Sequence, residues 1–253
     1  MKISIITATY NSANTIKDTL ACVAAQQYPF IEHIIVDGSS KDDTLKIVGE
    51  YKHVSKVISE KDNGIYDAMN KGVQLATGDI IGILNSDDFY TGSTILAKVA
   101  AAFEDPYVEA VYGDLQYVKS NNLDVITRTW KAGSYKKRYL YYGWMPPHPT
   151  FFVRRQIYEK CGLFNTTLRS AADYELMLRV LLKYNARVQY IPEVLVKMRA
   201  GGMSNASLKN RLRANKEDLM AWKLNDLKPF FFTIWLKPIR KVLQFNPTSI
   251  WQK

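Results

Sequence analysis

The sequence has few cysteines and no long apolar run, and each absence excludes a class of protein. Cys22 and Cys161 are the only cysteines among 253 residues, too few for a disulfide framework, which favours a reducing, cytoplasmic setting. No stretch of about 18 apolar residues is present, so we expect no membrane-spanning helix. The chain enters an apolar segment directly after Met1-Lys2, which predicts no secretory signal.

Glycine-rich phosphate-binding motifs are missing as well. The sequence contains neither G-x-G-x-x-G after its first apolar segment nor G-x-x-x-x-G-K-[ST] anywhere. These motifs let main-chain N–H groups approach phosphate groups closely. Their absence makes a dinucleotide dehydrogenase or a P-loop enzyme a poor fit.

Acidic residues are in the minority. The 34 Lys and Arg residues outnumber the 24 Asp and Glu residues, and the net charge of +10 attracts polyanions. Basic residues and aromatic rings are interleaved in residues 206–253, as suits an anionic membrane surface where rings lie at headgroup level. The alternative is a terminal helix that packs its rings on the domain. We expect no nucleic-acid partner, because no recognised motif accompanies the charge.

Three apolar segments that end in polar clusters are the most informative features present. They are Ile3–Asn11, His33–Ser40 and Ile80–Asp88. Nearly continuous β-branched runs bounded by turn residues are typical of strands buried on both faces of a parallel sheet. Segments with helical periodicity separate them. The sequence therefore predicts an α/β fold with a doubly wound, mostly parallel central sheet flanked by helices, followed by a helical and aromatic C-terminal tail.

An acidic cluster, Asn-Ser-Asp-Asp at residues 85–88, follows the third of these segments. Carboxylates just past a buried strand are costly to desolvate unless they bind a cation or hydrogen-bond donors. Ligands of open α/β sheets bind beyond the carboxyl ends of the strands, and Mg²⁺ is usually held there by one or two carboxylates plus substrate phosphates. We therefore expect a divalent metal, Mn²⁺ or Mg²⁺, at this cluster. The alternative is an ordinary turn or helix cap.

The end of the second segment also offers a binding group. Asp37 can accept the imide N–H of a pyrimidine base, with main-chain groups of Thr7–Tyr10 along the edge of the same base. The alternative is that Asp37 begins an Asx-turn. The pattern at this position leaves both open.

Four segments in register resemble the bacterial family 2 glycosyltransferases of GT-A fold. These segments are Ile3–Asn11, Val36–Thr44, Glu60–Gly72 and Gly78–Asp88, and the third is similar to a subgroup involved in surface-polysaccharide assembly. The resemblance covers residues 1–205. It implies a metal-dependent, inverting transfer of a sugar from a nucleotide-sugar, with UDP-sugar expected, to a hydroxyl of a glycan or polyprenyl-linked acceptor. Such enzymes are cytoplasmic and peripheral on the inner face of the plasma membrane.

The resemblance also assigns roles to individual residues. Asp87 matches the last acidic residue of the D-x-D pattern and would bind the metal. Asn85 stands where the family usually has Asp, so we expect it to retain a ribose hydrogen bond but not a direct metal contact. The residues that the resemblance assigns to nucleotide binding are Thr7, Thr9, Asp37, Asp62, Asn85 and Ser86.

Asp173 matches the catalytic base of the family, an acidic residue that opens a helix in the second half of the chain. A carboxylate there would take the proton of the acceptor hydroxyl as that hydroxyl attacks; the alternative is a helix cap. Glu175 is a poorer candidate, because two positions along a helix it points elsewhere. His148, Gly202 and Ser204 match positions near the diphosphate and acceptor, with a structural His and a plain turn as the alternatives.

Three regions follow from this interpretation. Residues 1–95 would bind the nucleotide-sugar, residues 96–205 would bind the acceptor within the same globular body, and residues 206–253 would form the basic, aromatic tail. A sugar nucleotidyltransferase is one alternative, although residues 8–12 lack the glycine and the cation that would grip a triphosphate. A non-catalytic nucleotide- or carbohydrate-binding module is the other.

Overall fold

The three apolar segments form parallel strands within one nine-stranded sheet. The structure is a computed structural model that describes residues 1–201, 208–242 and 244. The first four strands are β1 (Ile3–Thr9), β2 (Ile31–Asp37), β3 (Val54–Ser59) and β4 (Ile80–Ile83). β1 lies between β2 and β4 and is parallel to both, and Thr9 is in register with Asp37. The carboxyl ends of these strands therefore lie at one edge of the sheet.

The second half of the chain extends the same sheet. Its strands are β5 (Asp88–Tyr90), β6 (Ala110–Lys119), β7 (Asn122–Trp130), β8 (Phe152–Arg154) and β9 (Val188–Arg199). The strand order is β3-β2-β1-β4-β8-β6-β9-β5, with β7 on β6. β8 is antiparallel to both β4 and β6, whereas β6 and β9 are parallel. The short strand β5 was not predicted, because it begins inside the acidic cluster.

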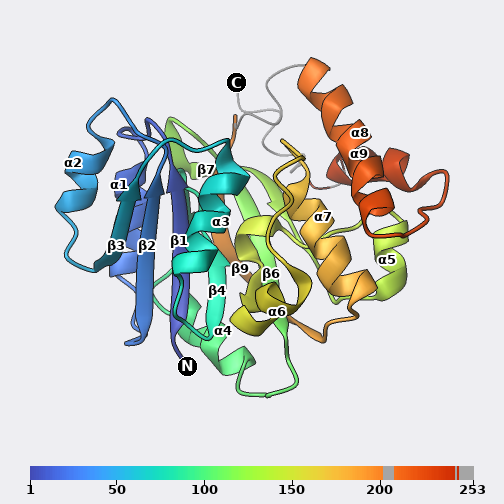
Figure 1. The fold of residues 1–253 in the computed structure, drawn as a ribbon, viewed down its shortest axis with the longest axis horizontal. Coiled ribbons are helices and arrows are strands. Elements are labelled where there is room, and N and C mark those ends of the chain that lie inside the picture. Colours follow the sequence, from blue (N-terminus) through green and yellow to red (C-terminus); the bar gives the residue numbers. More distant parts are fainter. Residues whose placement is uncertain (202–207, 243, 245–253) are drawn as a thin grey trace.

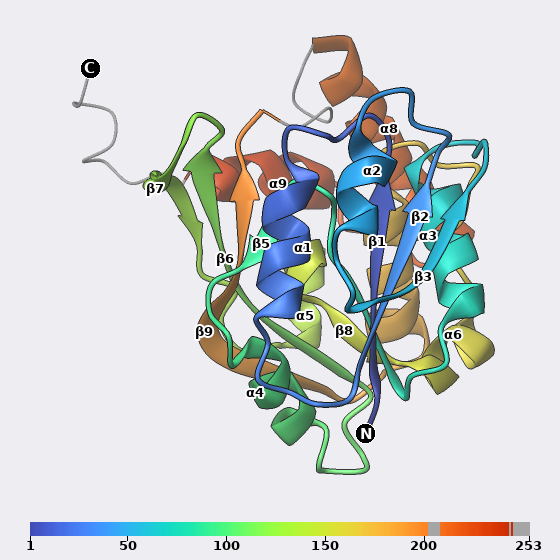
Figure 2. The ribbon, with the colours of Figure 1, turned by 90° about the vertical axis from the view of Figure 1, so that its left-hand side faces the viewer.

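Helices cover both faces of the sheet. They are α1 (Ile16–Ala24), α2 (Thr44–Gly49), α3 (Ile65–Leu75), α4 (Ile95–Ala102), α5 (Lys137–Tyr141), α6 (Arg155–Cys161) and α7 (Ala172–Leu178). A 3₁₀ turn, η1 (His148–Thr150), precedes β8, and a π-helical turn, η2 (Arg179–Lys183), continues α7. Helices α3 and α6 lie on one face, and α1 and α4 lie on the other (Figures 1 and 2). The predicted doubly wound α/β fold is confirmed.

Alternation along β1 divides the core between the two faces. Ile6 and Ala8 belong to the cluster under α3, whereas Ile3 and Ile5 belong to the cluster under α4, because successive side chains of a strand point to opposite faces. Gly72 lets α3 lie close to β1, since a Cβ there would be 2.3 Å from Cγ2 of Ile6. This close packing fixes the start of α3 at the carboxyl edge of the sheet.

The tail helices α8 (Leu208–Leu224) and α9 (Thr233–Val242) stand beside α7 and α5 (Figure 1). The indole of Trp222 is buried and donates a hydrogen bond of 2.9 Å to the hydroxyl of Tyr174. α9 is held by a 2.6 Å ion pair from Lys237 to Asp218. Among the helices described, none is long and apolar enough to cross a membrane.

Candidate active site

The turns after β1, β2 and β3 meet at the edge of the sheet. A Cβ on Gly38 would lie 2.6 Å from Oδ2 of Asp62 and 3.4 Å from Cδ2 of Tyr10, so these three positions are in direct contact. Asp62 accepts a 2.9 Å hydrogen bond from the main-chain N–H of Gly64, immediately before α3. The structure therefore brings Asp62 next to Asp37, although 24 residues separate them in the sequence.

The carboxylate of Asp37 is buried and already hydrogen-bonded. It accepts from the main-chain N–H of Ser40 at 3.0 Å, from the Ser59 hydroxyl at 2.6 Å and from the Ser40 hydroxyl. These bonds close the turn after β2, but the bonded N–H is three residues on, whereas the Asx-turn considered from the sequence would bond the N–H two residues on. A carboxylate has about four lone-pair sites, so one more hydrogen bond is compatible with this turn, and the contact between Asp37 and a nucleotide base stays a prediction.

The two threonines at the end of β1 differ. Thr7 lies within the sheet, and its hydroxyl is 3.0 Å from Nε2 of His33, which leaves only main-chain groups of Thr7 for the predicted nucleotide contact. Burial and the neighbouring His53 lower the pKa of His33 to about 3, so this imidazole is neutral. Thr9 ends the strand, and its buried Oγ1 has no hydrogen-bond partner among the residues described. Thr9 is therefore the better placed of the two.

The acidic cluster forms the tight turn between β4 and β5. Asn85 donates from Nδ2 to Oδ2 of Asp88 at 3.0 Å, and Ser86 is hydrogen-bonded to Ser12 at 2.9 Å between the two hydroxyl oxygens. Asp88 is fully buried, and its Oδ1 has no hydrogen-bond partner in the described part of the chain. Burial, and then the charge of Asp87, raise the pKa of Asp88 well above its usual range. The amide of Asn85 supports Asp88 here without adding a third negative charge.

Asp87 is half-buried and lines a cavity of about 490 Å³ with Asn14, Thr15 and Asn121. Its main-chain oxygen accepts a 2.6 Å hydrogen bond from Arg199, whose guanidinium is also paired with the carboxylate of Asp18 on α1. Burial raises the pKa of Asp87, and the charge of Arg199 partly offsets this effect. Arg199 therefore fixes the backbone at Asp87.

The acidic cluster fits a metal ion that the substrate helps to bind. No group of three His, Cys, Asp or Glu side chains converges within the ranges that the structure describes, so a site made of protein ligands alone is not seen there. Asp87 and Asp88 carry carboxylates whose charge is disfavoured by burial. Such carboxylates gain from a nearby cation, and Mg²⁺ is commonly held by one or two carboxylates plus substrate phosphates.

Asp173 is the second residue of α7, as predicted, and accepts a 3.0 Å hydrogen bond at Oδ1 from the hydroxyl of Tyr66 on α3. His148 is near enough for the negative charge of Asp173 to oppose the lowering of the His148 pKa by burial. Nε2 of His148 is buried and makes no hydrogen bond to the described residues. His148 also packs edge-on against Phe164, the ring on which Tyr66 stacks, so His148 and the Tyr66–Asp173 pair lie around the same ring. Gly202 and Ser204 lie outside the described residues.

Tyr117 on β6 interacts electrostatically with both Asp88 and Asp173. Burial raises the pKa of Tyr117, the Arg128 guanidinium 4.0 Å from its ring centroid lowers it, and the charges of Asp88 and Asp173 raise it further. Tyr117 and Asp88 are both in register with Met198 on β9, and the charges of Asp88 and Asp173 both act on the Tyr117 hydroxyl. Sequence reasoning missed Tyr66 and Tyr117, because their roles depend on contacts between distant segments. The only signal was the position of Tyr66 inside the Glu60–Gly72 segment.

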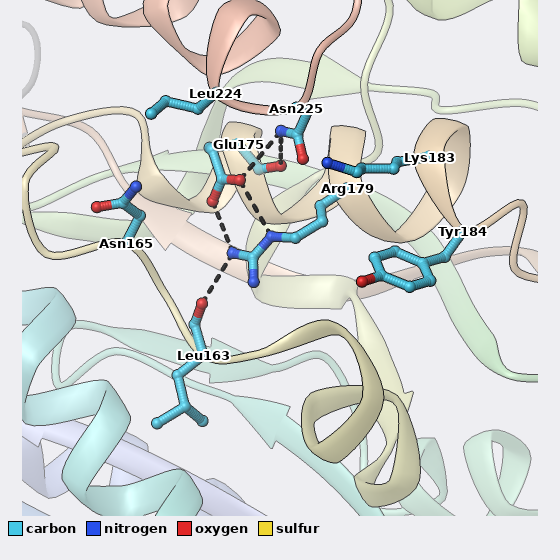
Figure 3. A pocket seen from close by; sticks show the side chains of 8 residues that line it. All are labelled: Leu163, Asn165, Glu175, Arg179, Lys183, Tyr184, Leu224 and Asn225. Carbon is cyan, nitrogen blue, oxygen red and sulfur yellow. Dashed lines mark hydrogen bonds and ion pairs between the residues drawn. The ribbon is translucent and has the colours of Figure 1, made fainter.

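Glu175, on the same helix as Asp173, is engaged elsewhere. It forms a 2.7 Å ion pair with Arg179 and accepts a 3.0 Å hydrogen bond from Asn225 (Figure 3). Arg179 also donates to the main-chain oxygen of Leu163 at 2.8 Å. These groups line a second cavity, of about 350 Å³, in which they satisfy one another. This arrangement agrees with the prediction that Glu175 is the poorer candidate for a base.

A family model described as Glycosyl transferase family 2 matches residues 4–162. A PGL/p-HBAD biosynthesis glycosyltransferase of Mycobacterium bovis is 32% identical over 211 residues, which are 80% of this chain and 78% of that protein. A UDP-Glc:alpha-D-GlcNAc-diphosphoundecaprenol beta-1,3-glucosyltransferase of Escherichia coli is 28% identical over 225 residues, 83% of each protein.

Two solved structures are similar in fold. S. aureus TarS 1-349 in complex with UDP-GlcNAc has a TM-score of 0.68 at 20% identity, covering 89% of this chain and 65% of that one. The mannosyltransferase PcManGT of Pyrobaculum calidifontis, in complex with GDP-Man and Mn²⁺, has a TM-score of 0.66 at 20% identity, covering 98% of this chain and 77% of that one. The chain spans 43% of a longer TarS chain. By its family match and its relatives, this chain belongs to glycosyl transferase family 2 and is a glycosyltransferase of GT-A fold.

Proposed function

We propose that this glycosyltransferase moves a sugar, with inversion and with a divalent metal, from a UDP-sugar to a hydroxyl of a lipid-linked glycan. The observation that supports the proposal is the placement of two acidic groups, the cluster directly after β4 and Asp173 in the first turn of α7, whose charges both act on the Tyr117 hydroxyl. The name of the Escherichia coli relative supplies the UDP-sugar and the diphosphoundecaprenol-linked acceptor as chemical precedents, and the TarS complex supplies a second UDP-sugar.

In this proposal Asp173 acts as the general base. The acceptor hydroxyl gives its proton to the Asp173 carboxylate as its oxygen forms a bond to the anomeric carbon. The bond from that carbon to the diphosphate breaks on the opposite face, and the nucleoside diphosphate leaves with the bonding electrons. The configuration at the anomeric carbon is inverted, because attack and departure occur on opposite faces.

The acidic cluster holds the diphosphate end of the sugar donor in this proposal. Asp87 would hold the metal, with Arg199 fixing its backbone and Asn85 with Asp88 keeping the turn closed. When bound, a divalent ion would neutralise the charge that develops on the leaving diphosphate. Thr9, Asp37 and Asp62 would bind the nucleoside. Residues 1–95 would then bind the sugar donor and residues 96–205 the acceptor.

The first test is a panel of sugar donors. We expect the protein with Mn²⁺ to release UDP from UDP-glucose or UDP-N-acetylglucosamine, slowly with water and faster with a polyprenyl-diphosphate-linked sugar, and not to release GDP from GDP-mannose. The measurement is coupled detection of the nucleoside diphosphate. Pyrophosphate formation from UTP and a sugar 1-phosphate, without transfer from any UDP-sugar, would contradict the proposal and indicate a nucleotidyltransferase.

We also propose that the enzyme is cytoplasmic and docks peripherally on the anionic inner face of the plasma membrane. The face in question is formed by α5, residues 228–232 and α9, and we call it the aromatic–basic face. Phe231 is 90% exposed and Trp235 is 72% exposed, and rings at headgroup level stabilise interfacial binding. Its other exposed members are Tyr142, Phe230 and Ile239 among apolar residues, and Lys136, Lys137, Arg138, Lys228 and Arg240 among cations.

The double variant Phe231→Ser/Trp235→Ser tests this docking. The wild type should sediment with phosphatidylglycerol vesicles and be released by high salt, since each cation near an anionic surface contributes about 1 kcal/mol that salt screens. The variant should lose vesicle binding but keep UDP-sugar binding, because Thr233 and Lys237 still anchor α9. Tyr107→Ser, which removes a 71% exposed ring elsewhere, is the matched control. Equal sedimentation of the double variant and the wild type, or no sedimentation of either, would refute the docking.

A further inference from the structure

A hydrogen bond crosses the site between two segments that are far apart in the sequence. The hydroxyl of Tyr66 donates to Oδ1 of Asp173 at 3.0 Å, across 107 residues. Tyr66 lies in the first turn of α3, which begins directly after the loop that contains Asp62. This contact therefore joins the side of the site assigned to the sugar donor with the proposed base.

The position of the Tyr66 ring is fixed by packing. The ring stacks on Phe164, with 5.8 Å between the centroids and 22° between the planes. The backbone of Phe164 is in turn bound to Asn70, one turn further along α3: Asn70 Nδ2 donates to the oxygen of Phe164 at 2.9 Å, and the N–H of Phe164 donates to Oδ1 of Asn70 at 2.9 Å. A single helix thus holds both the tyrosine and the ring on which it stacks.

The hydroxyl of Tyr66 stays protonated and can therefore always donate a hydrogen bond. Burial, and then the charge of Asp173, raise the pKa of Tyr66 well above its usual value, so the hydroxyl keeps its proton throughout the working pH range. Its hydrogen bond occupies Oδ1 of Asp173. The residues described give Oδ2 no hydrogen bond, so its lone pairs are available for the proton of an acceptor hydroxyl.

We infer that Tyr66 is a positioning residue that orients the Asp173 carboxylate toward the acceptor hydroxyl. The inference rests on the proposed function, because it takes Asp173 as the base. A hydrogen bond to the charged form of a carboxylate favours that form, and holding a reacting group in place lowers the entropic part of the barrier. Tyr66 acts only through Asp173.

Other titratable groups surround this pair and stay in place when Tyr66 is changed. His148 from η1 and Tyr117 from β6 both interact with the charge of Asp173. Glu217 from α8 interacts with Tyr66 and accepts hydrogen bonds from the N–H and hydroxyl of Ser170. A change in kcat on removing one hydroxyl can therefore be assigned to the hydrogen bond from Tyr66.

The test is Tyr66→Phe, which keeps the stacked ring and removes only the hydroxyl. We expect kcat to fall about 10-fold from lost orientation, with KM for the UDP-sugar unchanged. Tyr135→Phe is the matched control: it removes a half-buried hydroxyl that donates to the main-chain oxygen of Leu181 at 3.1 Å, and its kinetics should match the wild type.

The double variant Tyr66→Phe/Asp173→Asn separates the inference from the proposed function. If Tyr66 acts through Asp173, the double variant should be no slower than Asp173→Asn alone. An equal fold-loss from Tyr66→Phe in both backgrounds, or a change in KM only, would overturn the inference and leave Asp173 as the base. Wild-type activity of Asp173→Asn would instead remove the proposed base, and the inference with it.

Discussion

Replacing Asp173 by Asn is expected to reduce kcat for sugar transfer by about 100-fold or more, the usual effect of losing a general base. Asn retains the shape of the side chain and an oxygen that can accept the hydrogen bond from Tyr66, but it cannot take a proton from the acceptor hydroxyl. UDP-sugar affinity should stay near the wild-type value. Steady-state kinetics with a saturating acceptor, together with calorimetric binding of the UDP-sugar, measure the two effects separately.

The matched control for this substitution is Asp226→Asn. It makes the same chemical change at a side chain that is 86% exposed, in the turn after α8, and it should leave kcat unchanged. A loss of thermal stability or of UDP-sugar affinity in Asp173→Asn, with wild-type turnover for each bound donor, would show that Asp173 has a structural role instead.

Replacing Asp87 by Ala should abolish metal-dependent turnover and weaken the binding of UDP in the presence of Mn²⁺. The reason is that the side chain proposed to share the ion with the diphosphate is lost, and a bound ion typically contributes several kcal/mol to transition-state stabilisation. Chelation of the metal should have the same effect on the wild type. UDP binding by calorimetry, with Mn²⁺ and with chelator, should then show that the metal strengthens binding to the wild type only.

Glu104→Ala removes an exposed carboxylate just beyond α4, on a different part of the surface, and is the control for this prediction. It should behave as the wild type with and without Mn²⁺. Full turnover of Asp87→Ala in chelator would mean that the acidic cluster does not work through a metal, and the proposal would then lose its account of the diphosphate.

The central strands could be predicted from the sequence because they are buried on both faces. β1, β2 and β4 are nearly continuous apolar runs, whose burial is complete or almost complete. In the second half the apolar pattern indicates only the start of β6, at Ala110, Val111 and Tyr112, although β6 runs over Ala110–Lys119. The later residues of β6 pair with β7, the second arm of a hairpin, and with β9. β9 is distant in the sequence, so its contribution leaves no local periodicity.

The residues of the candidate site also fall into those that the sequence predicts and those that need the structure. Asp37, Asp62 and Asp87 follow strands or open a helix, so their positions at the sheet edge are readable from the order of elements. The hydrogen bond from Asn85 to Asp88 required the turn geometry. The role of Tyr66 required the hydrogen bond between α3 and α7, and that of Tyr117 required the register of β6 with β9. When the role of a side chain depends on a partner on another helix or strand, that role cannot be recognised from a single sequence.

The position of β8 has a consequence for how the chain folds. This three-residue strand pairs with β4 on one side and β6 on the other, so the sheet closes only after residues about seventy positions apart have met. Contacts of high sequence separation slow folding, and β4 without β8 would present an unpaired edge prone to association. A fragment ending near residue 95 would therefore lack the strand that completes its sheet, and the two halves of the enzyme acquire stability as one cooperative unit.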